Sequence, residues 1–517
     1  MKNTPITELS NEKSKNIDLL NLSDSIETLF SCEHEIFWNS FWDWILDSNF
    51  LYNLSKFKTI IDNKNNLEIK WSVILIWAGT SWRICKMIAD ICNTKRPQEI
   101  EIIPILSWWS DALIKAQINA EDNRDNWHND TEQILKKLNI KNTIIIWVTC
   151  WLSSSYVAGA LEAGLLLWCE NIAVIWFNKL EDTTMVFRHN NSINKIIKLN
   201  PILWPEAICW SVRMKWGSAT IMILAYLLYD SQNWQVNNIE TTKNYLSNIK
   251  NQHKLFYNNI LKHNLDIFSK WAKTLRNKWR IFYLSKWYAS YLCLFDMVEC
   301  FPTFGAESWQ INAFFESGIL FFEKFSYDNF KNHYDLSLAD FKKNIVFNKN
   351  DLYIFSWVDN TSDYISTNFN NQIIKMDLFL NIDDPIIKIL LYRSFLSYFS
   401  TYSFIQAWKV YWNMMIDVKI TNRKLFFRAC RIIWEILKID QDNAIIQLFR
   451  TIKKWSNNDF HYNEDNLEKI IETWSTVKNI IAKTIINNYY SNKTNYEIEL
   501  LLSDEPIIQK IISTLAK

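Results

Sequence analysis

The segment Ala78–Arg83 combines residue types that bind anions. Gly79, Thr80 and Ser81 follow an apolar, β-branched run, and a helical pattern begins directly behind them. Two hydroxyl groups and the N–H groups of a helix start form a cradle that suits a phosphate group. Neither a Walker-type Lys-Ser/Thr pair nor the three-glycine dinucleotide pattern is present. The segment therefore predicts a site for a sugar phosphate, with an ordinary capped turn as the alternative.

Two more polar clusters follow later in the chain. Thr149 and Ser153 lie in Thr-Cys-Trp-Leu-Ser-Ser-Ser, and Ser211 precedes Arg213 and Lys215. Clustered serines are often only helix caps, and basic residues on a turn are usually solvated. Hydroxyl clusters after two parallel strands nevertheless favour one shared site for a phosphate or a sugar.

Two glutamates are candidates for acid–base chemistry. Glu121 lies early in a long polar helical segment, where a lone carboxylate is usually solvated. Glu299 lies in an apolar context, next to the segment 300–305. Buried carboxylates tend to be hydrogen-bonded or functional, so Glu299 is the more unusual of the two.

An alternation of strands and helices must position these residues. The first predicted strands are 72–76, 100–106, 143–148 and 172–177, and the helices between them are 84–92, 113–138 and 156–167. Such alternation predicts a doubly wound parallel sheet of the α/β class, which binds ligands at the carboxyl ends of its strands.

A second α/β run begins near residue 280. Its predicted strands are 281–284, 314–322, 352–355 and 373–380. The stretch from Trp287 to Cys300 mirrors Trp77 to Cys92, which suggests an internal duplication. The segment 232–279 is predicted to be helical.

From about residue 405 the pattern indicates only helices, at 432–437, 444–452, 467–481 and 507–515. We therefore expect a C-terminal helical cap. The predicted domains are an N-terminal helical segment 1–50, a first unit 51–232, a second unit 233–404 and the cap 405–517.

Composition excludes several classes of protein. The net charge is +1, with no basic face for nucleic acid. The seven histidines and nine cysteines show no metal spacing and no C-x-x-C pair, so we expect no metal and no cofactor. No run of 18 apolar residues occurs, and the N-terminus lacks a signal sequence, so we expect a cytoplasmic protein without a membrane span.

The chain has 27 tryptophans and only 6 glycines. An average chain of this length holds roughly 36 glycines, because glycine makes up about 7% of residues. Trp77 and Trp82 flank the Ala78–Arg83 turn, where glycine is the residue that the backbone favours. We therefore hypothesise that the gene uses UGA for glycine and that the printed sequence translates it as tryptophan. The alternative is a chain that is truly rich in tryptophan.

With tryptophan read as glycine, several segments match a known pattern. Residues 78–83 become A-G-T-S-G-R, residues 107–111 become S-G-G-S-D, and residues 204–220 become G-P-E-A-I-C-G-S-V-R-M-K-G-G-S-A-T. Together with residues 300–305 and 407–424, they resemble the sugar isomerase (SIS) domain family. The resemblance is to the branch that contains N-acetylmuramic acid 6-phosphate etherase and the glucokinase regulatory protein.

The order of the segments favours the regulatory branch. An etherase resembles one SIS unit with a short helical tail, whereas this chain has two SIS-like units and a longer cap. The resemblance implies two tandem SIS-type doubly wound parallel-sheet units with a C-terminal α-helical cap. It also implies a fructose-phosphate-like ligand and a sugar kinase as a possible partner. Two fused units suit either a monomer that is an internal pseudo-dimer or a homodimer.

The resemblance also implies residue roles in ligand binding. The sugar phosphate would be bound by Gly79, Thr80, Ser81, Glu121, Thr149, Ser153 and Ser211, with Lys424 and Arg428 reaching it from the cap. Glu121 would accept hydrogen bonds from sugar hydroxyls. Val212 departs from the pattern, because the regulatory protein has a second serine there.

The resemblance to etherases requires two glutamates for elimination of lactate. One matches Glu121, but the other falls at Ile91 in the first unit. Glu299 occupies the equivalent place in the second unit, whose own turn, 287–291, lacks the Thr-Ser pair and the arginine. We therefore expect a non-catalytic sugar-phosphate sensor. The alternative is an etherase-like lyase in which Glu121 and Glu299 act together between the two halves.

Overall fold

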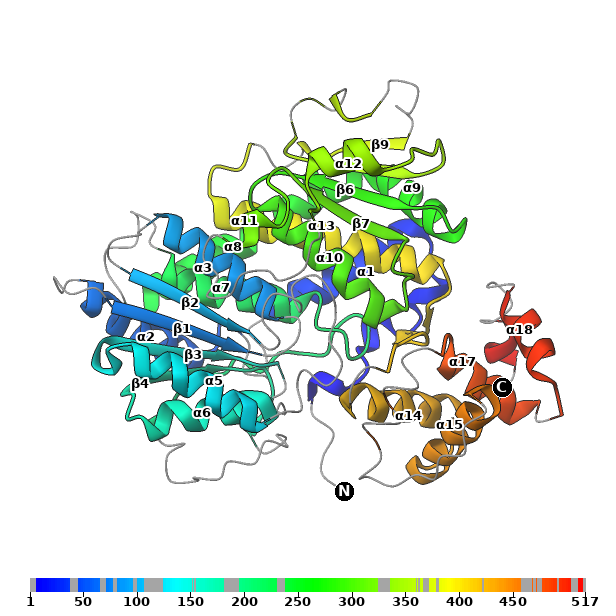
Figure 1. The fold of residues 1–517 in the computed structure, drawn as a ribbon, viewed down its shortest axis with the longest axis horizontal. Helices are drawn as coiled ribbons and strands as arrows, with labels where there is room; N and C mark the ends of the chain where they lie inside the picture. The colour runs from blue at the N-terminus through cyan, green and yellow to red at the C-terminus, as the bar shows by residue number, and fades with distance from the viewer. Residues whose placement is uncertain are drawn as a thin grey trace.

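The computed structural model contains two α/β units and a set of C-terminal helices (Figure 1). It describes residues 6–37, 45–65, 71–77, 81–95, 100–106, 124–150, 152, 155–180, 195–229, 238–323, 335–358, 360, 363–365, 372–377, 381–420, 423–456, 467, 471, 477–490, 492–503 and 510–514.

The first unit is built on a five-stranded parallel sheet in the order β2-β1-β3-β4-β5. Its strands are β1 (Trp71–Trp77), β2 (Ile100–Leu106), β3 (Thr143–Val148), β4 (Asn171–Ile175) and β5 (Ile197–Leu199). Four of these strands were predicted, and the short β5 was missed. The parallel doubly wound arrangement is confirmed.

Alternating side chains of β1 enter two separate cores. Val73 and Leu75 join the core shared with α3 (Ser81–Lys95) and α7 (Lys215–Leu228), whereas Ile74 and Ile76 face α5 (Arg124–Lys137) and α6 (Ser155–Leu166). Both faces of the strand are apolar because helices cover both faces of the sheet. This burial fixes the register that places α3 directly behind the first turn.

The second unit repeats the arrangement with a four-stranded parallel sheet in the order β7-β6-β8-β9. Its strands are β6 (Ile281–Ser285), β7 (Ile311–Phe315), β8 (Leu352–Ser356) and β9 (Ile373–Lys375). The predicted strand 314–322 was wrong. The chain leaves β7 at Phe315, turns at Gly318 with φ 59°, and begins helix α11 (Leu320–Glu323), so one apolar run serves two elements.

The duplication is visible in the helix that follows the first strand of each unit. Helix α3 begins at Ser81, and α10 (Ala289–Phe304) begins at Ala289. With these starts aligned, Cys85 corresponds to Cys293 and Cys92 to Cys300. All four cysteines are buried, so the two helices present the same face to their cores.

Further helices enclose the two units. These are α1 (Leu22–His34), α2 (Ser48–Asn65), α8 (Ile239–Asn259), α9 (Leu265–Arg276), α12 (Leu338–Asn344) and α13 (Pro385–Gln406). Helices α8 and α9 bear out the helical prediction for 232–279, and α13 packs on α9, α10 and α1. The domain boundaries given above stay predictions.

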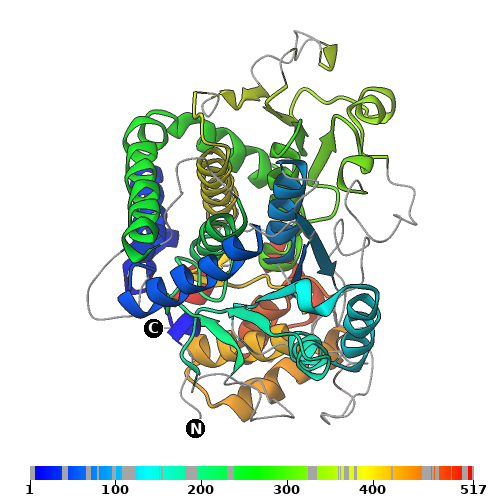
Figure 2. The same cartoon turned by 90° about the vertical axis from the view of Figure 1, so that its left-hand side faces the viewer.

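The C-terminal part is not purely helical, which corrects one prediction. A hairpin of β10 (Val410–Tyr411) and β11 (Met414–Met415) precedes α14 (Arg423–Leu437), α15 (Gln441–Ser456), α17 (Ile480–Tyr489) and α18 (Asn495–Ser503). Figure 1 shows α14 and α15 below the second unit and beside the first, and Figure 2 shows the same orange helices at the bottom of the view. Most of the predicted helices 467–481 and 507–515 lie outside the described residues.

The N-terminal residues join the C-terminal part to the first unit. The Thr7 amide donates to Asn178 Oδ1 at 3.1 Å, and the Asn413 amide group donates to Ser10 Oγ at 3.0 Å and to Ser14 Oγ at 3.1 Å. Arg431 Nη1 on α14 pairs with Glu8 at 3.0 Å. The segment 6–19 therefore contacts both the sheet unit and the C-terminal helices.

Candidate functional site

The predicted site lies at the carboxyl edge of the first sheet. Ser81 is the first residue of α3, which follows β1, and Thr149 directly follows β3, the neighbour of β1 in the sheet. Thr149 is buried, and its Oγ1 accepts a hydrogen bond from the Leu152 amide at 3.3 Å. The arrowheads of β1, β2 and β3 point toward the centre of the molecule (Figure 1). The edge therefore faces the middle of the molecule.

Several predicted site residues cannot be placed. Gly79, Thr80, Glu121 and Ser153 lie outside the described residues, as do the side chains of Ser81 and Lys424. Arg428 is half-buried on α14, and Lys424 lies one turn earlier on the same helix. The ligand roles of all these residues stay predictions.

Ser211 is buried in the turn before α7. Its amide donates to the Ile208 carbonyl at 3.1 Å, and its Oγ accepts from the Arg213 amide at 3.3 Å. The basic residues behind it are not solvated, contrary to the usual expectation for such a turn. Arg213 is 4% exposed and Lys215 is 0% exposed.

Lys215 is part of a buried charge cluster at the start of α7. Its Nζ pairs with Glu35 at 2.7 Å and donates to the Pro205 carbonyl at 2.8 Å. Glu206 accepts the first amides of α7, from Lys215 and Trp216, both at 3.0 Å. Burial raises the pKa of the Glu206 carboxyl to about 7, although Lys215 and these amides oppose the shift.

Glu299 of the second unit contacts the first unit's turn. Arg83, the third residue of α3, donates from Nη1 to Glu299 Oε1, and both residues are buried. Burial lowers the pKa of Arg83, whereas Glu299 acts to raise it. Sequence alone did not pair the two, because the contact crosses 216 positions. A residue expected to act in the second unit is thus paired with Arg83, the last residue of the segment predicted to bind a phosphate in the first.

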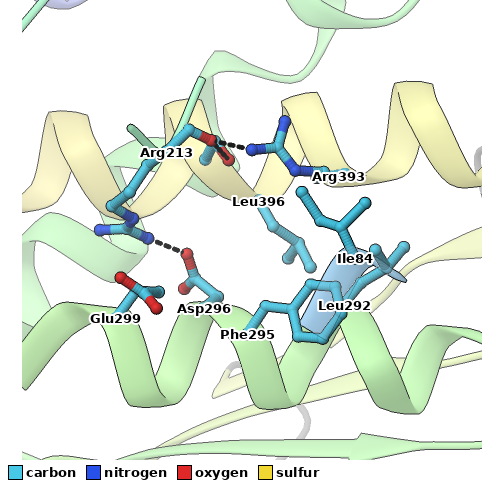
Figure 3. Close-up of a pocket in the computed structure, with 9 residues that line it drawn as sticks. Ile84, Arg213, Leu292, Phe295, Asp296, Glu299, Arg393 and Leu396 are labelled. Carbon is cyan, nitrogen blue, oxygen red and sulfur yellow. Dashed lines mark hydrogen bonds and ion pairs between the residues drawn. The ribbon is translucent and has the colours of Figure 1, made fainter. Parts of the chain in front are cut away.

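A second charge pair also crosses between the units. Arg213 Nη2 donates to Asp296 Oδ1, one turn before Glu299 on α10 (Figure 3). The same nitrogen also donates to Ser400 Oγ at 2.8 Å. Asp296 also accepts from Tyr283 at 2.6 Å and from Ser400 at 2.7 Å. Burial raises the pKa of Asp296, and Arg213 opposes this. The pair was missed, although a lone aspartate in the apolar sequence of α10 could have signalled it.

Arg393 on α13 adds a third contact to this region between the two units, which we call the seam. Its guanidinium donates to the Arg213 and Met214 carbonyls and to Ser218 Oγ at 3.0 Å. Gly217 allows this approach, because a β-carbon there would overlap the guanidinium. The loop that carries Ser211 is therefore held by both α10 and α13.

The seam encloses a small cavity lined by residues of both units (Figure 3). Its volume of ≈ 20 Å³ is enough for about one water molecule and too small for a sugar phosphate. The lining includes Arg213, Asp296, Glu299 and Arg393. The seam is therefore a packed, charged contact beside the predicted turn.

Helix α10 also contacts the C-terminal part, less than two turns after Glu299. The Lys419 amide donates to the Pro302 carbonyl at 3.2 Å, and Asp417 lies against Gly305. Asp417 in turn pairs with Lys409 at 2.7 Å and accepts from the Asn479 amide, just before α17, at 3.1 Å. One helix thus connects the first unit's turn to the C-terminal helices.

Comparisons with known proteins identify both ends of the chain. Residues 54–165 match the family model of the glucokinase regulatory protein N-terminal SIS domain, and residues 412–512 match that of the C-terminal lid domain of glucokinase regulatory protein. The first unit is thus similar to an SIS domain, and the C-terminal helices, with the hairpin before them, are similar to the lid domain. The resemblance inferred from the sequence is confirmed.

Individual relatives agree with this assignment. The chain is 25% identical over 374 residues to the glucokinase regulatory protein of Xenopus laevis, covering 66% of this chain and 60% of that protein. For the human protein the identity is 22% over 519 residues, covering 87% and 82%. An N-acetylmuramic acid 6-phosphate etherase of Clostridium acetobutylicum is 28% identical over 223 residues, covering 42% of this chain and 66% of the etherase.

Solved structures include tagatose-6-phosphate ketose/aldose isomerase from Escherichia coli, which has 13% identity and a TM-score of 0.42. The match covers 76% of this chain and 94% of the isomerase.

Within the described residues, no group of three or more His, Cys, Asp or Glu side chains could hold a metal ion. No helix of the described ranges is long and apolar enough to cross a membrane.

Proposed function

We propose that this protein is a sugar-phosphate-binding regulator of the glucokinase regulatory protein type. It would sense a fructose-phosphate-like ligand in the first SIS unit and act on a sugar kinase or another enzyme of hexose metabolism. The lid match at 412–512 is the observation that carries this proposal, because the lid comes from a regulatory protein and not from an etherase. The relatives named as regulators also extend over more of the chain.

The seam between the units supports a role in signalling. In the proposed site, a ligand phosphate at the first turn would lie beside Arg83, whose charge is engaged by Glu299. A ligand that competes for Arg83 would release Glu299, which lies less than two turns before Gly305, where α10 ends against Asp417 of the matched lid segment. Binding could then bias the position of the lid through differential contacts with the two states.

The same seam argues against the etherase alternative. The first unit has Ile91 at the position equivalent to Glu299, and an aliphatic side chain cannot transfer a proton. Glu299 is engaged with Arg83 and lines a cavity of only ≈ 20 Å³. We therefore assign Glu121, Thr80, Ser81, Thr149, Ser153, Ser211, Lys424 and Arg428 to binding and not to catalysis.

None of the nine cysteines forms a disulfide, and eight are buried, which suits a reducing compartment such as the cytoplasm. We propose a cytoplasmic protein on this ground. A monomer is the expected oligomeric state, because the two fused units already cover each other's charged faces.

Calorimetric titration tests the ligand. Fructose 6-phosphate, fructose 1-phosphate and N-acetylmuramic acid 6-phosphate are titrated into the full chain, made with glycine at the UGA positions. Saturable binding of a fructose phosphate is expected, and Ser81→Ala should weaken it about fivefold through loss of one hydrogen bond. Ser290→Ala, in the second unit's turn, is the matched control and should leave affinity unchanged. Absence of binding to all three compounds overturns the proposal.

Activity assays separate the regulator from the enzyme. Inhibition of ATP-dependent hexose phosphorylation by a kinase of the same organism, altered by the bound sugar phosphate, is the expected result. Release of lactate from N-acetylmuramic acid 6-phosphate, abolished by Glu121→Gln, would instead establish the lyase.

A further inference from the structure

Six tryptophans adopt a backbone conformation that tryptophan disfavours. Among the described residues, eleven residues other than glycine have φ between 48° and 63°. Six of these eleven are tryptophans: Trp168, Trp210, Trp287, Trp357, Trp408 and Trp412. The left-handed region brings the β-carbon against the backbone, so that glycine, and to a lesser degree asparagine and aspartate, occupy it. For a bulky aromatic residue it is an outlier, and six such outliers in one chain need a common cause.

Two of the six lie at helix ends of one specific kind. At the end of α6, Trp168 donates to the Leu165 carbonyl at 3.2 Å, and Cys169 donates to the Gly164 carbonyl at 3.2 Å. This pair of bonds is the Schellman motif, in which the left-handed residue is usually glycine.

The end of α13 repeats the motif. Trp408 donates to the Ile405 carbonyl at 3.1 Å, and Lys409 donates to the Phe404 carbonyl at 3.0 Å. Helix α10 ends with a true glycine in the left-handed region, Gly305 with φ 65°. Tryptophan thus stands at α13 where α10 has glycine.

Two more lie in tight turns that require positive φ. Trp412 is the first of two residues that join β10 to β11, and a type II′ hairpin turn takes glycine at that place. Trp210 is the third residue of the Ile208–Ser211 turn, the position at which a type II turn needs positive φ. The Trp210 turn carries Ser211 of the proposed ligand site.

The indole groups give a second, independent observation. Buried tryptophans usually find an acceptor for the indole N–H. In the part of the chain that the structure describes, several buried or half-buried indole nitrogens have no hydrogen-bond acceptor, among them those of Trp71, Trp147, Trp176, Trp210, Trp271, Trp357 and Trp455. Trp210 and Trp357 appear in both sets.

We propose that positions 168, 210, 287, 357, 408 and 412 carry glycine in the protein made by its own host, which reads UGA as glycine. The backbone at these positions fits glycine, and the chain is short of glycine by about the number of its excess tryptophans. The assignment is independent of the sugar-phosphate proposal, because three of the six positions, 168, 357 and 408, lie outside every predicted ligand turn. It names residues that composition alone did not single out, Trp168 and Trp357 among them.

The coding sequence and the native protein test the assignment directly. The gene should have TGA at all six codons. Peptide mapping by mass spectrometry of the protein from its host should find glycine at each of them. Lys278 is a control, because it occupies the same Schellman position at the end of α9, with φ 56°, and its codon cannot be UGA. Tryptophan in any of the six native peptides, or TGG at any of the six codons, overturns the proposal.

A stability measurement on the recombinant full chain gives a test that does not depend on the host. Trp408→Gly should raise the thermal midpoint, on the order of 1 °C, because it relieves the left-handed strain at the end of α13. Trp434→Gly, within α14, should lower the midpoint, because glycine weakens a helix. A fall in the midpoint for Trp408→Gly contradicts the assignment at that position. The ligand titration is a separate measurement, so its failure would leave this result unaffected.

Discussion

Helices α3 and α10 are equivalent in the two units, yet they carry opposite charges into the seam. Where α3 has Arg83, α10 has Tyr291, which is packed against Phe321 and Phe322 with ring centroids 5.3 and 4.8 Å away. At the positions of Ile88 and Ile91 in α3, helix α10 has Asp296 and Glu299. The turn of the first unit is polar, whereas aromatic rings pack at the equivalent place in the second unit. Helix α10 of the second unit supplies the acidic residues that pair with the first unit.

This divergence makes each half dependent on the other. The base and the acid of each pair lie in different units, so Arg83–Glu299 and Arg213–Asp296 both join the first unit to the second. Loss of one partner would leave a charge buried in the seam. The comparison predicts that making α10 resemble α3 costs stability.

The largest effect is expected from Asp296→Ala. It leaves the buried Arg213 guanidinium without its carboxylate and should lower the free energy of unfolding by about 4 kcal/mol. Urea unfolding of the full chain measures this. Glu316→Ala is the control, because Glu316 pairs with Lys286 at the surface, where the loss should stay below about 1 kcal/mol. Equal losses for the two variants would show that the seam pair is not structurally important.

A double-mutant cycle on Arg83 and Glu299 tests the second pair. Arg83→Leu and Glu299→Leu should each cost about 3 kcal/mol, since each leaves a buried charge without this partner. The double variant should be more stable than the sum of the two losses predicts, by about 1–3 kcal/mol. Additive losses would mean that the two side chains act separately.

The ends of α10 and α13 sharpen the comparison within the second unit. Gly305→Ala should destabilise the protein by about 2–3 kcal/mol, because a β-carbon there is strained and would overlap the Asp417 carboxylate. Trp408→Gly should stabilise it by about 1 kcal/mol. Thermal unfolding of both variants checks the opposite signs. Destabilisation by both would show that φ does not govern these positions.

Sequence patterns predicted the sheets well because their strands are buried on both faces. Runs such as 143–148 and 281–284 contain almost only apolar residues, and helices on both sides leave few other conformations. The run 314–322 was wrongly predicted as one strand, because aromatic residues are buried equally well at the end of β7 and in α11. Apolar character marks burial in both cases, and only Gly318 distinguishes the two elements.

The candidate site was predictable only in part, for a geometric reason. Turns after β1 and β3 meet at one sheet edge, so Ser81 and Thr149 could be grouped from local sequence alone. Arg83–Glu299 and Arg213–Asp296 join positions 216 and 83 residues apart, and no local pattern encodes such pairs. Arg213 and Lys215 also contradict the usual expectation that basic residues are solvated, because carboxylates from other elements neutralise them.

The smallest expected effect is a difference in pH dependence between two buried clusters. Glu206, in the first unit, has a pKa of about 7, raised by burial. As pH falls from 7 toward 4.5, the folded state binds this proton before the unfolded state does, so the cluster gains stability. His34 and His253, whose Nδ1 atoms lie 3.1 Å apart on α1 and α8, behave oppositely.

Burial lowers the pKa of His34 to about 3 and also lowers that of His253. Glu33, Lys250 and Lys254 are the charged groups that face this pair most directly. Below pH 6.5 the two histidines bind protons in the unfolded state but not in the folded state, so lowering the pH destabilises the fold. With the opposing contribution of Glu206 included, the free energy of unfolding should fall by about 1 kcal/mol for each pH unit.

Unfolding free energies at pH 7.5, 6.5 and 5.5 measure the two contributions. Glu206→Gln should steepen the loss toward acid, because it removes the compensating proton uptake, whereas His253→Asn should flatten it. If both variants keep the parent slope, the two clusters do not titrate between these pH values, and their burial acts on packing alone.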